Sequence, residues 1–212
     1  MFEAGREAVV RGLPMIAAMT PGRSGNLSVR DGDRVAITPS GVPYRDIEPA
    51  DVPVLSIDGT RLHGDLEPSS EVPMHLGITR ELDAGAIAHV HSPWATTLAV
   101  LREPLPTVHY ILALAGGEVP VAPYATYGTE ALAQNAVDVM SEHDTSACIL
   151  ANHGLVATGT DVESALETLQ AVESTARVYL QARSVGEPAP LGEAEMEAVY
   201  DQLESYGQPE ET

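Results

Sequence analysis

Two histidines separated by one residue, His89 and His91, have the clearest capacity for chemistry in this sequence. The chain contains no lysine, so no side chain can form a Schiff base with a carbonyl substrate or with pyridoxal phosphate. Carbonyl chemistry would need another electron sink, and a divalent metal ion supplies one. Alternate residues of a strand point to the same face, so a strand over residues 86–91 would offer both imidazoles to one ion.

A third histidine, His153, lies in the tripeptide Asn152-His153-Gly154 between two short apolar segments. A catalytic zinc ion commonly takes three protein ligands and leaves one position open, which these three histidines would provide. The adjacent glycine allows close approach of the backbone. The alternative is that they are core or surface histidines satisfied by hydrogen bonds, and spacing alone leaves both interpretations open. The remaining histidines without a companion residue are expected either at ordinary polar positions or in contact with the site residues from behind; these are His63, His75 and His143.

The segment Glu67-Pro68-Ser69-Ser70-Glu71 precedes a predicted helix and forms a second cluster. Serine hydroxyls and free amides at a helix start can bind an anion such as phosphate, because the helix dipole favours negative charge there. An N-cap followed by an acidic first turn needs no ligand and by itself is the more frequent arrangement. Turns at Gly25-Asn26 and Ser40-Gly41 could close around the same phosphate.

Hydrophobic periodicity predicts the helices and strands that would position these residues. Helices are expected at residues 3–19, 71–82, 93–101, 128–142, 162–183 and 192–203, and strands at 27–29, 34–38, 52–57, 86–91, 147–151 and 155–158. Several strands are paired like hairpins, which favours an α/β or α+β layer over a doubly wound sheet. We expect a single domain over residues 1–212.

Composition restricts the partners of this chain. Its 31 acidic and 11 basic residues give a formal net charge of −20, which disfavours binding to nucleic acid or anionic membranes. Acidic excess without lysine is typical of proteins from very salty cytoplasm, where salt screens self-repulsion; an ordinary acidic protein is the alternative. Without a signal peptide or a long apolar run, a soluble cytoplasmic protein is expected. The lone Cys148 lies in a predicted buried strand and is interpreted as a core residue.

Seven segments, in order along the chain, resemble motifs of the class II aldolase/adducin family, and most closely those of its branch that acts on L-fuculose 1-phosphate. Each motif is common alone, whereas seven in register are specific. The match continues to Ser205-Tyr206-Gly207 near the end of the chain. The segments are Ser24-Gly25-Asn26-Leu27-Ser28-Val29-Arg30, Thr38-Pro39-Ser40-Gly41, Pro68-Ser69-Ser70-Glu71, His89-Val90-His91, His109-Tyr110, Ala122-Pro123-Tyr124-Ala125-Thr126-Tyr127-Gly128-Thr129 and Asn152-His153-Gly154-Leu155.

This resemblance implies an α/β fold with a central antiparallel sheet flanked by helices in three layers. It also implies a homotetramer whose active sites lie between neighbouring subunits. The implied cofactor is zinc on His89, His91 and His153, with Glu71 as a fourth ligand when substrate is absent. Cobalt and manganese are alternatives, because imidazole accepts several divalent ions.

The resemblance also implies roles for residues around the metal. A phosphorylated sugar would place its phosphate against Gly25, Asn26, Ser40, Gly41, Ser69 and Ser70. Glu71 would carry the proton to and from the donor carbon, and Tyr110 of the adjacent subunit would act at the aldehyde oxygen. Tyr206, in a flexible tail at about residues 205–212, would close over the site.

Two departures from the family pattern concern the substrate site. Arg23 stands where a small hydroxyl residue is expected, so its guanidinium would either approach the phosphate or point to solvent. The segment Val72-Pro73-Met74 replaces a bulkier one after the glutamate, which leaves the shape of the aldehyde pocket open.

The implied reaction is reversible cleavage of a ketose 1-phosphate to dihydroxyacetone phosphate and a short aldehyde such as L-lactaldehyde. Fuculose, ribulose and deoxyribulose phosphates all remain candidate substrates, because one methyl or hydroxyl group contributes only about 1–3 kcal/mol of discrimination. Within the superfamily, a pentulose-phosphate 4-epimerase and a thioribulose-phosphate dehydratase are alternatives; the former usually has aspartate at the position of Glu71. A non-enzymatic adducin-like interaction module is disfavoured by the three histidines.

Overall fold

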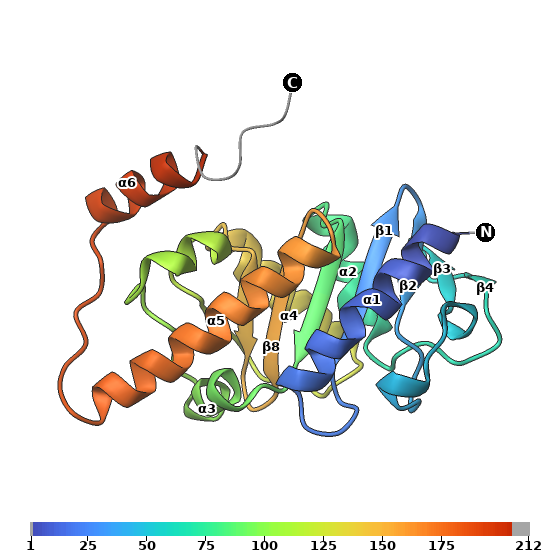
Figure 1. The fold of residues 1–212 in the computed structure, drawn as a ribbon, viewed down its shortest axis with the longest axis horizontal. Coiled ribbons are helices and arrows are strands. Elements are labelled where there is room, and N and C mark those ends of the chain that lie inside the picture. The colour runs from blue at the N-terminus through green and yellow to red at the C-terminus, as the bar shows by residue number, and fades with distance from the viewer. Residues whose placement is uncertain (1, 205–212) are drawn as a thin grey trace.

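The fold is built on one eight-stranded sheet, seen in a computed structural model that describes residues 2–204 (Figure 1). The strand order is β4-β3-β2-β1-β5-β8-β7-β6, and every neighbouring pair is antiparallel except β6 and β7, which are parallel. The strands are β1 Asn26–Asp31, β2 Arg34–Ile37, β3 Val54–Ser56, β4 Arg61–His63, β5 Ala86–Val90, β6 Val121–Ala122, β7 Ala147–Leu150 and β8 Gly154–Gly159. The predicted central antiparallel sheet is confirmed.

Helices cover both faces of the sheet and produce three layers (Figure 1). One face carries α1 Glu3–Met19, α3 Pro93–Leu101, α5 Val162–Arg183 and the 3₁₀ segment η3 Tyr110–Ala115; the other carries α2 Val72–Glu81 and α4 Glu130–Glu142. The last helix, α6 Glu193–Glu204, packs beside η3. Short 3₁₀ turns, η1 Tyr44–Asp46 and η2 Pro49–Asp51, connect β2 to β3.

The central strand β5 is buried on both faces, and the alternation of its side chains decides where its histidine points. Ala86, Ala88 and Val90 join the hydrophobic cluster under α5, whereas Ile87 joins the cluster under α2 and α4. His89 has the same parity as Ile87. Its imidazole is therefore directed toward the α2 side of the sheet.

Neighbouring strand β1 continues this polar strip. Asn26 is paired with His89 across the β1–β5 ladder, and Ser28 is paired with Ile87. The side chains of Asn26 and Ser28 form hydrogen bonds on the α2 side, while Leu27 packs in the cluster under α5. Two adjacent strands thus offer polar side chains to the start of α2.

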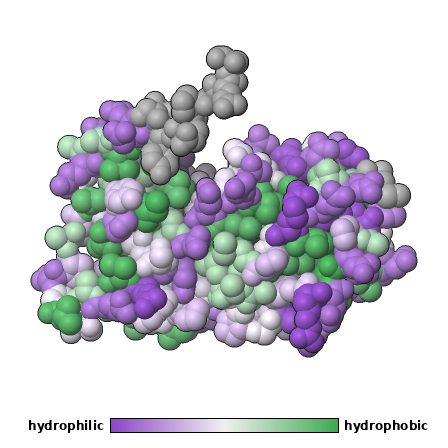
Figure 2. All heavy atoms as spheres, in the orientation of Figure 1, coloured by the Kyte–Doolittle hydropathy of each residue, from purple (hydrophilic) through white to green (hydrophobic). Residues whose placement is uncertain are grey.

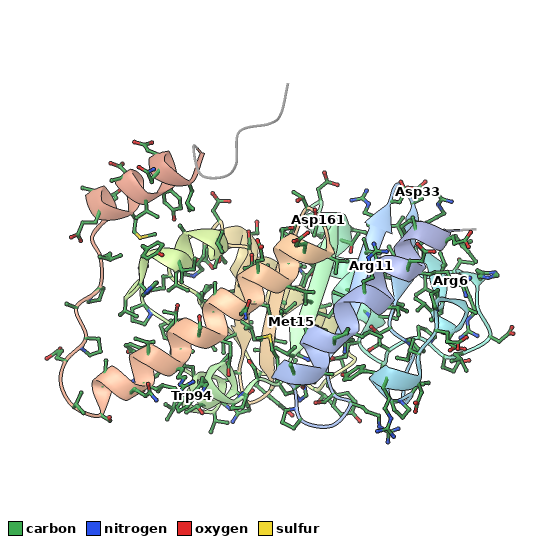
Figure 3. The ribbon with its side chains drawn as sticks, viewed as in Figure 1. Arg6, Arg11, Met15, Asp33, Trp94 and Asp161 are labelled. Atoms are coloured by element: carbon green, nitrogen blue, oxygen red, sulfur yellow. The ribbon has the colours of Figure 1, made fainter. Side chains whose placement is uncertain are left out.

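Capping interactions explain several helix ends. The side chain of Asp161 accepts a hydrogen bond from the Ser164 amide (2.9 Å) at the start of α5 (Figure 3). Thr129 caps α4 in the same way through the Leu132 amide (3.3 Å), so α4 begins at Glu130, slightly after the predicted start.

The surface matches the acidic composition. Figure 2 shows hydrophilic residues spread over the face that carries α1 and α5, with hydrophobic groups between them. No helix within residues 2–204 is long and apolar enough to cross a membrane. The predicted flexible tail at about residues 205–212 lies outside the described residues.

Sequence periodicity missed the short strands β4 and β6 and the 3₁₀ segments η1, η2 and η3, all of six residues or fewer. Segments this short do not establish a period in the sequence and are formed by pairing with distant neighbours. Strand β5 ends at Val90 rather than His91, so His91 lies just beyond the sheet hydrogen bonds.

Candidate metal centre and active site

The three histidines singled out in the sequence lie together. Their candidate ligand nitrogens are all within 4.8 Å of one another, and their ring centroids are 4.8–4.9 Å apart. His89 and His91 come from the end of β5, and His153 comes from the turn between β7 and β8. Strand parity predicted that the first pair would share a face, and the family resemblance added His153 to it.

The β7–β8 turn is shaped to bring His153 close to the other two. Asn152 has a positive φ of 55°, and its neighbour Gly154 is tightly packed. A Cβ at Gly154 would lie 2.4 Å from the Val90 carbonyl and 3.0 Å from the His91 ring. Only glycine allows β8 to approach this closely, so Gly154 sets the spacing of the three imidazoles.

Each imidazole is suited to donate a lone pair. His89 is fully buried, and its Nδ1 donates to the Leu155 carbonyl (2.9 Å), which directs Nε2 toward the cluster. Burial and the nearby His89 lower the pKa values of His91 and His153 to about 4. Both are therefore neutral at neutral pH, which is the form of histidine that binds a metal.

Glu71, the residue immediately before α2, completes the cluster. Its Oε2 lies 3.1 Å from His89 Nε2, and its Oε1 lies 3.3 Å from His153 Nε2. Asn26 Nδ2 donates to Oε2 (2.9 Å). Burial alone would raise the pKa of Glu71, but the interactions with His89, Asn26 and His153 outweigh it and place the pKa below its ordinary value. The group is therefore a carboxylate.

This donor set fits a divalent cation. Three imidazole nitrogens and one carboxylate are the ligand types of catalytic zinc sites. Two polar atoms of the cluster, Glu71 Oε1 and His153 Nδ1, are buried without a hydrogen-bond partner among the described residues. A cation coordinated by the carboxylate would compensate the first of these atoms, because a buried unpaired oxygen is costly. His89, His91, His153 and Glu71 are the residues that would hold it.

A hydrogen-bonded chain supports Glu71 from inside the protein. The carboxylate only accepts, so the Asn26 amide must donate to it and turn its Oδ1 toward His75 Nε2. His75 Nε2 therefore carries the proton, and Nδ1 accepts from the Ser28 hydroxyl (2.6 Å). All four side chains are buried. The donors consequently point one way, from Ser28 to Glu71.

The sequence left His75 either at an ordinary polar position or in contact with the residues of the site, and the structure shows the second, in the chain that supports Glu71. His75 follows Glu71 by four residues, so both lie on one side of α2. The alternation of Asn26 and Ser28 on β1 was the second available signal. Neither pattern is specific without knowing that β1 and α2 pack together.

His91, His153 and Glu71 border a cavity of about 350 Å³, and His89 lies buried behind them. All six residues predicted to bind phosphate line it: Gly25, Asn26, Ser40, Gly41, Ser69 and Ser70. The loop before α4 adds Tyr124 and Tyr127, which the sequence did not assign to the site. Gly128 brings this loop close, because a Cβ there would lie 2.7 Å from the Ser70 carbonyl.

Backbone hydrogen bonds reduce the number of amide donors that the predicted phosphate-binding segments have free for a ligand. The Ser40 amide donates to the Glu67 carbonyl (2.8 Å), and the Ser69 amide donates to the Thr38 carbonyl (3.0 Å). These amides hold the two segments together and are not free for a ligand. The side-chain hydroxyls, together with the Gly41 and Ser70 amides, therefore remain as the donors available to an anion.

Other predicted residues lie elsewhere. Tyr110 begins η3, is 54% exposed and stacks on His109, but it does not line this cavity. Tyr206 lies outside the described residues. The segment Val72-Pro73-Met74 forms the first turn of α2 and also stays out of the cavity wall, with Met74 buried in the core.

The fold and this cluster define the class of protein. Residues 8–180 match the family model described as the class II aldolase and adducin N-terminal domain, and the chain belongs to that family. It is an enzyme of the class II aldolase superfamily. The expected family membership is thus confirmed.

Particular relatives are also sugar-phosphate aldolases by name. The chain is 43% identical to 5-deoxy-D-ribulose 1-phosphate aldolase of Bacillus thuringiensis, over 95% of this chain and 96% of the relative. It is 38% identical to 5-methylthioribulose-1-phosphate/5-deoxyribulose-1-phosphate aldolase of Rhodospirillum rubrum, over 98% and 90%. Among solved structures, an L-fuculose 1-phosphate aldolase superposes with a TM-score of 0.89 at 40% identity, covering 95% and 96% of the two chains.

Proposed function

We propose that this chain is a zinc-dependent aldolase that reversibly cleaves a ketose 1-phosphate into dihydroxyacetone phosphate and a short aldehyde. The observation that carries the proposal is the cluster of three histidines and Glu71 at one end of a cavity whose wall, beyond His91, His153 and Glu71, includes small polar residues. A metal at one end and anion donors at the other suit a phosphorylated carbonyl compound. Another divalent ion could replace zinc at such a site.

We propose that the phosphate lies against Ser40, Gly41, Ser69 and Ser70, with Gly25 and Asn26 beside them. Hydroxyls and unpaired amides donate to phosphate oxygens without requiring a fixed charge. This contact would orient the ketose so that its carbonyl group faces the histidines. Orientation of this kind is a large part of the rate enhancement in such reactions.

Glu71 is the proposed proton carrier at the donor carbon. A bound divalent ion would polarise the substrate carbonyl and stabilise the negative charge that develops during cleavage. Asn26 holds Oε2 by a hydrogen bond, whereas Oε1 has no hydrogen-bond partner among the described residues. Oε1 is therefore the oxygen that gives the proton to the three-carbon half in cleavage and removes it in the reverse reaction.

The proton at the aldehyde oxygen needs a second group. We propose Tyr110 of a neighbouring copy in a homotetramer, because the chain's own Tyr110 is exposed and stands outside the cavity. Tyr206 is proposed to close over the site. A monomeric protein with full activity would contradict the assignment of Tyr110.

For the aldehyde half, we propose a 5-deoxypentulose 1-phosphate as the preferred substrate, with L-fuculose 1-phosphate as the second candidate. Two relatives named for 5-deoxyribulose 1-phosphate share 38% and 43% identity over at least 95% of this chain. Cleavage between C3 and C4 would then release acetaldehyde rather than lactaldehyde. The exposed rings of Tyr124 and Tyr127 provide an apolar and aromatic surface at the cavity for such a small group.

The activity is tested by product analysis. Purified protein loaded with zinc is incubated with dihydroxyacetone phosphate and acetaldehyde, methylthioacetaldehyde or L-lactaldehyde, and the ketose phosphates formed are quantified. Acetaldehyde should give the highest kcat/KM. A 4-epimerase or a dehydratase would not join dihydroxyacetone phosphate to a free aldehyde, so the absence of any ketose phosphate product with all three aldehydes would refute the proposal.

The roles of the cluster are tested by two variants. His91→Ala should lose bound metal, measured by elemental analysis, and activity. Glu71→Gln should retain metal but lose exchange of the donor-carbon proton in deuterated water. Glu67→Gln is the matched control, because Glu67 is exposed and paired with Arg61 (2.7 Å). Full metal content in His91→Ala, or wild-type exchange in Glu71→Gln, would show the assignments to be wrong.

A further inference from the structure

Arg23 is the single side chain with a permanent positive charge among the described residues that line the cavity. The same wall includes the Glu71 carboxylate, and the whole chain carries a formal charge of −20 with no lysine. Apart from the proposed metal ion at the histidine end, the protein therefore offers a phosphate dianion an unfavourable overall field. A cationic side chain at the phosphate end of the cavity would offset that repulsion locally.

The loop that carries Arg23, between α1 and β1, is held in place at both ends. The hydroxyls of Thr20 and Ser24 lie 3.1 Å apart, and Ser24 Oγ donates to the Pro21 carbonyl (3.0 Å). Tyr44 donates through its hydroxyl to the Gly25 carbonyl (2.6 Å). Arg23 therefore lies at the cavity on a loop that hydrogen bonds hold at both ends.

The guanidinium of Arg23 connects this loop to the segment predicted to bind phosphate. Its terminal nitrogen donates to the Gly41 carbonyl (2.5 Å), and no carboxylate forms an ion pair with it among residues 2–204. A guanidinium has five N–H donors, and this contact uses one of them. The remaining donors and the full charge are available to a ligand beside Ser40 and Gly41.

We propose that Arg23 binds the substrate phosphate and makes the enzyme selective for phosphorylated ketoses, an inference that rests on the proposed function. The guanidinium would keep its hydrogen bond to Gly41 and donate further to phosphate oxygens. Charge-assisted hydrogen bonds of this type are about twice as strong as neutral ones. The competing explanation is that Arg23 only clamps the two loops together.

Three variants separate charge from clamping. Arg23→Gln can still donate to the Gly41 carbonyl but has no charge, whereas Arg23→Lys keeps a charge. Arg80→Gln is the matched control, because Arg80 is also an exposed arginine that donates to a backbone carbonyl, that of Ile57 (3.2 Å), and it does not line the cavity. Each protein is loaded with zinc and titrated with inorganic phosphate by calorimetry. KM and kcat are then measured with ketose 1-phosphates and with the unphosphorylated ketoses.

Arg23→Gln should weaken phosphate binding and raise KM about 10- to 100-fold, the range expected for loss of one charge-assisted hydrogen bond. Its kcat and its kcat/KM for unphosphorylated ketose should stay within about twofold of wild type. Arg23→Lys should recover part of the affinity, and Arg80→Gln should match wild type. The KM of wild type should also rise more steeply with ionic strength than that of Arg23→Gln.

Wild-type phosphate affinity in Arg23→Gln would overturn the proposal and leave Arg23 as a clamp. Equal weakening in Arg23→Gln and Arg23→Lys, with no dependence on charge, would also overturn it. If wild-type protein bound phosphate through Arg23 but released no aldehyde from any ketose phosphate, the proposed aldolase function would fail while the phosphate site stood. The calorimetric titration with phosphate therefore distinguishes failure of the Arg23 proposal from failure of the proposed aldolase function.

Discussion

Replacing His75 with phenylalanine tests whether the buried hydrogen-bonded chain supports Glu71. His75 is completely buried and is the only link between Ser28 and Asn26 in that chain among the described residues. A phenylalanine ring has a similar shape but neither donates nor accepts. The Ser28 hydroxyl and the Asn26 carbonyl oxygen would both lose their partner on His75.

The expected magnitude follows from those two groups. A buried polar group left without a partner costs about 1–3 kcal/mol, so two such groups cost about 2–6 kcal/mol. The more apolar ring recovers about 1 kcal/mol of that loss. We therefore expect His75→Phe to lower the free energy of unfolding by about 1–5 kcal/mol. Adding Ser28→Ala should restore about 1–3 kcal/mol, because it removes one of the unpaired groups.

The same substitution should act on catalysis. Without the donor on His75, the Asn26 amide is no longer held with its NH₂ toward Glu71 Oε2. We expect kcat to fall about tenfold, corresponding to about 1.4 kcal/mol, while KM for the ketose phosphate changes less. His75→Gln, which can still donate an N–H, should lose less of both activity and stability.

Two measurements decide the matter. Denaturant unfolding at equal protein concentration gives stability, since subunit association would otherwise contribute. Steady-state kinetics and exchange of the donor-carbon proton give the catalytic effect. A His75→Phe protein that is destabilised but has wild-type kcat and exchange would show that His75 is only a packing residue. An unchanged unfolding free energy would refute the hydrogen-bond argument itself.

Three further results are expected from buried or partly buried groups. Glu173 accepts hydrogen bonds from Ser92 Oγ (2.7 Å), Trp94 N (3.0 Å) and Ala95 N (2.8 Å) at the start of α3, the helix whose first turn includes Trp94 (Figure 3). Glu173→Ala should lower the free energy of unfolding by about 2–5 kcal/mol, measured by denaturant unfolding. A loss below about 1 kcal/mol would contradict this capping role. Burial raises the pKa of Tyr44 to about 12. Because the folded pKa exceeds the unfolded value near 10, this stabilisation is complete below pH 10 and is lost as pH rises toward 12. Ultraviolet titration of wild type minus Tyr44→Phe should therefore show one phenol ionising near pH 12 rather than near 10. Burial likewise raises the pKa of Cys148 to about 12, so the thiol should resist iodoacetamide at pH 8 until denaturant is added, and rapid labelling of the native protein would show that it is accessible.

The sequence alone determined the arrangement of helices and strands in layers and the residues of the expected metal site. Periods of two and 3.6 residues located the long helices and the central strands, because each of these elements is long enough to show its period. The parity of His89 and His91 followed from local strand geometry. Motifs in a fixed order identified the family and grouped His153, Glu71 and the phosphate segments in one expected site.

Only the tertiary structure decided how those groups are supported. Ser28, Asn26 and His75 belong to β1 and α2, which are separated by more than 40 residues, and no local pattern pairs them. The Ser40 and Ser69 amides are occupied by backbone pairing that the turn-like sequence did not reveal.

The placement of Arg23 has the same origin. The sequence allowed the Arg23 guanidinium to lie either at the phosphate or in solvent. In the structure, its hydrogen bond to the Gly41 carbonyl places Arg23 at the cavity wall. A side chain's type and period are local properties, whereas its hydrogen-bond partners depend on which distant segments pack beside it. For this protein, the residue types that could bind a metal and a phosphate were therefore predictable from the sequence, whereas the hydrogen-bond partners of those residues were decided by tertiary packing.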